Sequence, residues 1–174
     1  MSLHSQTIDS FELARASRQI DGWVNVADLL RLSSLLADSS GALHYRVTGV
    51  ADVEGQPGAQ LQLTGLLRLT CQRCNEPLEF QLDRAVLFRF MASEEALNAL
   101  PIEEDEIDAV VGSRTMNLRD WIEDEAMLSL PLVARHDECL AANSTPDFDP
   151  VKVANPFAAL SAMRDALNDD KGNT

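Results

Sequence analysis

The feature that most constrains the fold is a pair of neighbouring segments in which apolar and polar residues alternate with a period of two. From Leu61 to Cys71 the odd-numbered positions are apolar, apart from Gly65, and most even-numbered positions are polar. The alternation returns from Leu78 to Phe90, interrupted by Arg84. A period of two indicates strands with one face toward a core and one toward solvent. The two segments therefore predict a long antiparallel hairpin, and Arg84 indicates a β-bulge in its second strand.

Shorter patterns predict the remaining elements. Helices are expected after Asp9 or Ser10, from Val26 to Leu36, after Ser93 and after Asn117. The first of these helices is expected to end at Ile20–Trp23, and further strands are expected at Leu43–Val47 and at Ile107–Gly112. Together they predict an α+β fold: an antiparallel sheet with a long central hairpin, either open or curled toward an open barrel, flanked by helices and followed by a C-terminal helical tail.

The chain divides by composition into three parts. Residues 1–140 are expected to form a single α+β domain, since 174 residues suffice for one domain with its own core. Residues 141–154 are rich in polar residues and proline, which predicts a linker or loop. Residues 155–174 are expected to form a helix and tail, with Asn155 as N-cap, Pro156 at the first helical position and Phe157 on the apolar face. That face either packs on the domain or docks a partner.

The charge of the chain limits its partners. Asp and Glu number 28 against 14 Lys and Arg, for a net charge of −14. This charge disfavours direct binding to a phosphate backbone and favours a basic protein partner. The first residues are polar and no apolar run approaches the length of a membrane span, so a cytoplasmic protein with reduced thiols and no membrane contact is expected.

Cys71 and Cys74 are predicted to lie at the tip of the hairpin, and three interpretations are open. A thioredoxin-like redox pair needs a helix N-terminus after the first cysteine, whereas here Pro77 and a second strand follow. A structural zinc site needs two further ligands, which His136 and Cys139 could supply as a Cys3His set, although 61 residues separate the two pairs. In the third interpretation the cysteines are small apolar residues at the end of the sheet.

Acidic residues of the helix after Asn117 are the other candidates. Glu125 lies on the apolar side of this helix, where a carboxylate either needs a partner such as Arg73 or reaches water at the edge. Glu123 is expected to face solvent. Consecutive acids on a helix point in different directions, which disfavours a magnesium site here.

Three segments together resemble the YceD family, the large ribosomal RNA subunit accumulation proteins. They are the sequence CQRC at Cys71–Cys74, EDEAMLSLPLVARH at Glu123–His136 and NPFAAL at Asn155–Leu160. The positions that match the family's motifs are Cys71, Arg73, Cys74, Glu125, Leu130, Pro131, Asn155, Pro156 and Phe157. Other branches of the family carry further cysteines after the Leu-Pro pair, where this chain has only His136 and Cys139.

The resemblance implies a bacterial cytoplasmic factor needed for the synthesis, processing or stability of 23S ribosomal RNA. With the negative charge, it predicts a non-catalytic protein that binds a basic ribosomal protein or a large-subunit precursor particle, with any RNA contact indirect or confined to an arginine patch. Arg68, Arg73, Arg84 and Arg89 could form that patch or could be paired structurally. The alternatives are a metal-dependent ribonuclease, whose carboxylates would come from the stretch Glu94–Glu125, and a Cys-x-x-Cys redox module.

Overall fold

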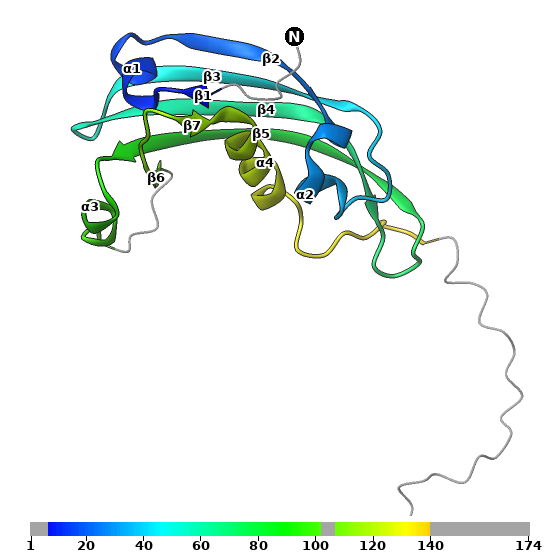
Figure 1. Ribbon diagram of the computed structural model, residues 1–174. Helices are drawn as coiled ribbons and strands as arrows, with labels where there is room; N and C mark the ends of the chain where they lie inside the picture. The colour runs from blue at the N-terminus through cyan, green and yellow to red at the C-terminus, as the bar shows by residue number, and fades with distance from the viewer. Residues whose placement is uncertain (1–6, 102–106, 140–174) are drawn as a thin grey trace, which may run out of the picture. The chain divides into compact units, whose positions relative to one another are not determined.

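The computed structural model describes residues 7–101 and 107–139, which form an α+β fold around one five-stranded sheet (Figure 1). The sheet has the order β2-β3-β4-β5-β6, and its strands are β2 (Gln19–Asn25), β3 (Ala42–Val53), β4 (Gln56–Thr70), β5 (Pro77–Met91) and β6 (Ile107–Val111). A separate two-stranded pair joins β1 (Thr7–Ile8) to β7 (Met116–Asn117). The helical elements are α1 (Ser10–Arg15), the 3-10 turn η1 (Val26–Asp28), α2 (Leu30–Ser33), α3 (Glu94–Asn98) and α4 (Leu118–Leu128).

The predicted central hairpin is present as β4 and β5. Their antiparallel pairing runs without a shift from Gly58 opposite Arg89 to Thr70 opposite Pro77. The bulge expected at Arg84 is therefore wrong, because Arg84 pairs in register with Leu63. The side chain of Arg84 stays on the core face of the strand and donates a hydrogen bond to the carboxylate of Glu125 there. A bulge that would turn this side chain outward is therefore not required.

The sheet is open, and the expected alternative, a sheet curled toward an open barrel, is wrong. Closure would require the edge strands to pair with each other. Instead, within residues 7–101 and 107–139, β2 pairs only with β3, and the five residues of β6 pair, in parallel, with one end of β5, from Leu87 to Met91. The connection from β5 to β6 passes through α3, as a parallel pair requires a crossover rather than a tight turn.

One face of the sheet carries the core. Buried side chains come from alternate positions of the strands, including Leu43, Val47, Leu61, Leu63, Leu67, Val86, Phe88 and Phe90. Helices add Leu13, Leu32, Leu118 and Ile122 to the same cluster, and Figure 1 shows α2 and α4 on one side of the sheet. The opposite face is largely exposed, with Trp23 at 66% and Leu66 at 45% of their full accessibility.

The helix caps that were predicted from the sequence are confirmed. The side chains of Asp9 and Asn117 each accept hydrogen bonds from two backbone N–H groups, at the start of α1 and α4, and that of Ser93 accepts one at the start of α3. Such caps satisfy backbone donors that have no partner within the helix.

Two other local predictions are wrong. The single helix expected from Val26 to Leu36 is divided into η1 and α2, because Leu29 leaves helical geometry, with φ −98° and ψ 85°, and is fully buried. The segment Ile20–Trp23, expected to end the first helix, lies within β2, and α1 already ends at Arg15. Gly22 fits there because a Cβ atom at this position would lie 2.8 Å from the hydroxyl oxygen of Tyr45.

The C-terminal predictions fall outside the described residues. The expected linker at 141–154 and the helix with Asn155, Pro156 and Phe157 lie there, so the division of the chain at residue 140 stays a prediction. Among the helices of the described residues, none is long and apolar enough to cross a membrane.

Candidate metal centre

The hairpin tip is a closed turn that presents Cys71 and Cys74 on the same side. The backbone N–H of Cys71 donates to the carbonyl of Glu76 at 2.9 Å, and that of Asn75 donates to the carbonyl of Cys71 at 2.9 Å. Asn75 has a φ of 62°, a left-handed conformation that asparagine tolerates better than most residues. The turn therefore returns the chain sharply into β5 and brings the two thiols near each other.

The segment that follows α4 lies across this tip. The N–H of Gln72 donates to the carbonyl of Ala134 at 2.9 Å, and its side-chain amide donates to the carbonyl of Leu132 at 3.4 Å. A guanidinium N–H of Arg73 donates to the carbonyl of His136 at 3.4 Å. These hydrogen bonds hold His136 and Cys139 over the cysteines of the hairpin.

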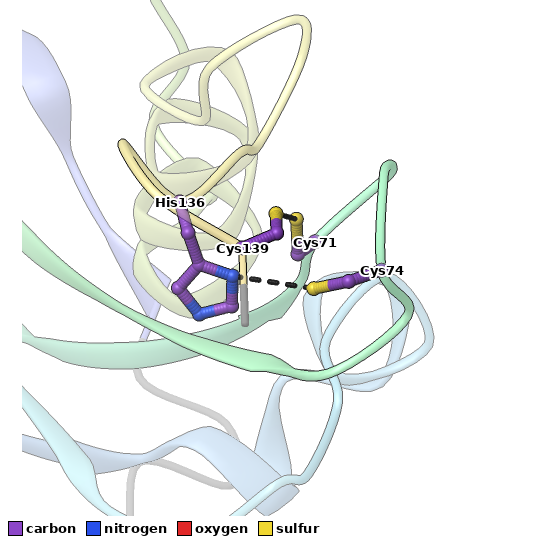
Figure 2. Close-up of side chains that lie close together, drawn as sticks. All are labelled: Cys71, Cys74, His136 and Cys139. Atoms are coloured by element: carbon purple, nitrogen blue, oxygen red, sulfur yellow. Dashed lines mark hydrogen bonds between the residues drawn. The ribbon is translucent and has the colours of Figure 1, made fainter. Parts of the chain in front are cut away.

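The four candidate ligands named from the sequence come together here. Figure 2 shows Cys71, Cys74, His136 and Cys139 with their side chains pointing toward one another. Their ligand atoms all lie within 4.8 Å of one another. The Sγ atoms of Cys71 and Cys139 are 3.7 Å apart, and Sγ of Cys74 lies 3.4 Å from Nδ1 of His136. Cys71 and Cys139 are buried, whereas Cys74 and His136 are half-buried.

Two neighbours orient the ligands. Nε2 of His136 lies 3.1 Å from the carbonyl oxygen of Pro77. Because a carbonyl can only accept, Nε2 carries a proton, and in the neutral ring Nδ1 then presents its lone pair to the cluster. Nε of Arg73 donates to Sγ of Cys139 at 2.9 Å. This contact gives the family-matched Arg73 a defined place beside the thiols.

The electrostatics of the cluster favour a thiolate at Cys71. Burial opposes ionisation of this thiol, but hydrogen bonds from the backbone N–H groups of His136, Arg73 and Cys74 lower its pKa to about 5. At Cys74 the N–H of Glu76 favours the thiolate, yet burial and the neighbouring sulfurs raise the pKa above its ordinary value. The sulfurs of Cys71 and Cys139 raise the pKa of His136.

Three sulfurs and an inward-facing imidazole nitrogen form a donor set that suits soft or borderline metal ions. The geometry does not suit the thioredoxin-like arrangement, because Cys71 and Cys74 lie between β4 and β5, and the element that directly follows them is a strand rather than a helix.

Glu125 has a partner, but it is not the one expected. Its carboxylate is 3% exposed, and Oε1 accepts a hydrogen bond from Nε of Arg84 at 3.1 Å. Arg73, the partner named from the sequence, contacts Cys139 instead. Burial raises the pKa of Glu125, Arg84 opposes this shift, and the negative charge of Asp108 adds to it.

The four arginines of the hairpin do not gather in one patch. Arg68 pairs with Asp38 at 3.2 Å and Arg89 with Glu54 at 2.7 Å. Arg84, bound to Glu125, lies on the core face of the sheet, opposite to the face of Arg68 and Arg89, because facing residues of paired strands share a side. Structural pairing therefore accounts for all four.

Glu123 was expected to face solvent, which is wrong. It is 5% exposed, and its Oε1 accepts hydrogen bonds from the backbone N–H groups of Arg31 at 2.6 Å and Leu32 at 3.1 Å. Its Oε2 accepts another from Nε of Arg31 at 3.0 Å. Glu123 of α4 thus caps the N-terminus of α2, a helix that is distant in sequence but in direct contact in the fold. No local signal could have revealed this, because the partners are more than ninety residues apart in sequence.

The two remaining family-matched positions of the described region lie at the exit of α4. Leu130 packs against the core, whereas Pro131 is exposed. Together they lead the chain from α4 into the segment that covers the hairpin tip.

The fold and the cluster define a class of protein: an open-sheet α+β domain whose central hairpin carries a Cys3His cluster at its tip. A family model described as "Large ribosomal RNA subunit accumulation protein YceD" matches residues 59–164, which include the whole cluster. The chain therefore belongs to the YceD family.

A curated relative supports this assignment. The protein from Haemophilus influenzae named "Large ribosomal RNA subunit accumulation protein YceD" is 26% identical, over 91% of this chain and 94% of the relative. No solved structure matches the chain.

Proposed function

We propose that this protein is a ribosome biogenesis factor required for the synthesis, processing or stability of 23S ribosomal RNA. The observation that carries the proposal is membership in a family named for accumulation of the large-subunit ribosomal RNA. In this proposal the protein works in the cytoplasm, where precursor particles assemble.

A binding role without catalysis is supported by the state of the buried carboxylates. A nuclease would need several of them to converge on metal ions at one pocket. Glu123 and Glu125 instead point to different partners, since the first caps α2 and the second binds Arg84. Both carboxylates are therefore already engaged in structural contacts.

The proposed partner is a basic ribosomal protein or a large-subunit precursor particle. A net charge of −14 attracts cationic surfaces and repels exposed phosphate backbones. The pairing of Arg68, Arg84 and Arg89 with carboxylates further reduces the positive charge available for RNA. Any contact with RNA is thus expected to be indirect.

The test of the function is the ratio of large-subunit to small-subunit ribosomal RNA in cells depleted of the protein. A selective fall in the large-subunit RNA, restored by the wild-type gene, is the expected result. An unchanged ratio under full depletion would refute the proposal.

Two biochemical experiments test the mode of action. Capture of the partner on the immobilised protein should weaken markedly between low and physiological salt, because exposed charges are screened over about 8 Å at 0.15 M salt. Binding that ignores salt would contradict a charge-driven contact. Cleavage of precursor RNA by the purified protein with magnesium, abolished by Glu123→Gln and Glu125→Gln, would establish a nuclease instead.

A further inference from the structure

We propose that Cys71, Cys74, His136 and Cys139 together bind one zinc ion, which fastens the segment after α4 to the tip of the central hairpin. The proposal rests on the geometry of the four ligands and on the groups that surround them, and it is independent of the role in ribosomal RNA accumulation.

The distances between the ligand atoms fit a tetrahedral site. With Zn–S bonds of about 2.3 Å and Zn–N bonds of about 2.0 Å, the ligand atoms of a tetrahedron lie roughly 3.5 to 3.8 Å apart. The Sγ atoms of Cys71 and Cys139 are 3.7 Å apart, and Sγ of Cys74 is 3.4 Å from Nδ1 of His136. The remaining pairs lie within 4.8 Å, so small side-chain rotations would complete the tetrahedron.

The surroundings of the ligands also fit a metal. The carbonyl of Pro77 fixes the proton of His136 on Nε2, which leaves Nδ1 free to coordinate. A histidine ligand whose other nitrogen donates to a backbone carbonyl is the usual arrangement in zinc sites. Nδ1 faces the sulfur of Cys74, so the lone pair points into the cluster rather than toward solvent.

The charge of the occupied site would be balanced by a neighbour. Three thiolates, one neutral imidazole and Zn²⁺ sum to a charge of −1. The guanidinium of Arg73, with Nε 2.9 Å from Sγ of Cys139, supplies the compensating positive charge and a hydrogen bond to the sulfur. This accounts for an arginine between the two cysteines of the hairpin.

The site would be structural. Four protein ligands close the coordination sphere of zinc and leave no position for a substrate or an activated water. The two ligand pairs come from segments that are far apart in the chain. The described residues otherwise join these segments through hydrogen bonds of Gln72, Arg73 and the carbonyl of Pro77. Zinc would add four metal–ligand bonds that join the hairpin tip to the segment after α4.

The first experiment measures metal content. The protein is purified under reducing conditions without added chelator, and zinc is quantified by elemental analysis. We expect one zinc per chain in the wild type and in the control His44→Asn, because His44 lies beside Trp23 and belongs to no ligand cluster of the described region. The matched variant His136→Asn and the variant Cys74→Ser should retain well under half of this amount.

A second experiment uses the wild type alone and so holds even if the variants fail to fold. Cobalt titrated into the metal-free protein should produce thiolate-to-cobalt charge transfer and tetrahedral visible bands, saturating at one equivalent and displaced by zinc. Free zinc at a concentration one thousand times its dissociation constant should raise the melting temperature of the metal-free protein by roughly 10 °C.

Three results would overturn the proposal. They are a reduced wild-type protein that neither contains zinc nor binds cobalt, stoichiometric iron in place of zinc, and undiminished zinc in His136→Asn and Cys74→Ser.

Discussion

Arg84→Met should lower the free energy of unfolding, because it removes the charged partner of the buried carboxylate of Glu125. Glu125 is 3% exposed and receives its charged hydrogen bond from Arg84. Removal of one partner from a fully buried ion pair costs about 3 to 5 kcal/mol. Because the side chain of Arg84 is 49% exposed, water screens part of this interaction, and we expect a loss of about 2 kcal/mol at pH 8.

The loss should depend on pH in a defined direction. Burial raises the pKa of Glu125 above its ordinary value, Arg84 opposes the shift, and Asp108 adds to it. Without Arg84 the folded-state pKa rises further. At pH 4, which lies below the ordinary pKa of glutamate and further below the raised folded-state pKa, the carboxyl is mostly protonated, so the variant should lose little stability there. The loss should then grow as the pH rises above the folded-state pKa of the wild type. It should level off above the higher folded-state pKa of the variant, where the folded state holds the uncompensated charge.

Urea denaturation, followed through tryptophan fluorescence, measures this effect. Trp23 is already 66% exposed in the folded protein, so the change on unfolding comes mainly from the buried Trp121. Trp121 packs edge-on against Phe88 and Phe90 in the core, so it reports unfolding of the sheet and α4 together. A loss of 2 kcal/mol should lower the urea midpoint by about 1 M at pH 8. The double variant Arg84→Met, Glu125→Gln leaves no unpaired buried charge, so it should recover at least half of the lost stability. An Arg84→Met variant as stable as the wild type at pH 8, or equally destabilised at pH 4 and pH 8, would refute the reasoning.

Two further substitutions test contacts of the helices: the close approach of α1 to the sheet and the capping of α2 by Glu123. Gly49→Ala would place a Cβ atom 2.0 Å from the carbonyl oxygen of Leu13, so α1 must move, and we expect the free energy of unfolding to fall by about 3 kcal/mol. The control Gly55→Ala has open space but a positive φ and should cost about 1 kcal/mol. Equal losses in the two variants would contradict the close approach of α1 at Gly49. Glu123→Ala should cost about 2 kcal/mol by leaving the N-terminus of α2 uncapped, whereas the exposed neighbour Asp124→Ala should cost under about 0.5 kcal/mol. Urea denaturation of the two proteins decides this comparison, and a reversed order would exclude capping by Glu123.

Local sequence information determined those features of the fold that depend on residues close together in the chain. The alternation from Leu61 to Cys71 and from Leu78 to Phe90 predicted the central hairpin, since a strand with one buried face imposes a period of two. Asp9, Ser93 and Asn117 were identified as caps because each bonds to N–H groups within three residues.

The candidate site could be named from the sequence but not assembled from it. Cysteine and histidine are the residues that bind zinc, so Cys71, Cys74, His136 and Cys139 could be selected by chemistry alone. Sequence could not show whether the two pairs meet, because 61 residues separate them. The meeting depends on where α4 ends and on how the following segment crosses the hairpin.

Only the tertiary structure decided which charged residues pair and that the sheet stays open. Glu123 caps a helix more than ninety residues away, and Glu125 binds Arg84 rather than Arg73. Periodicity shows which side of a strand is buried, yet it carries no information on which strands become neighbours or whether the edges join. Those outcomes follow from the packing of distant segments around one core, and only the folded chain brings these segments together.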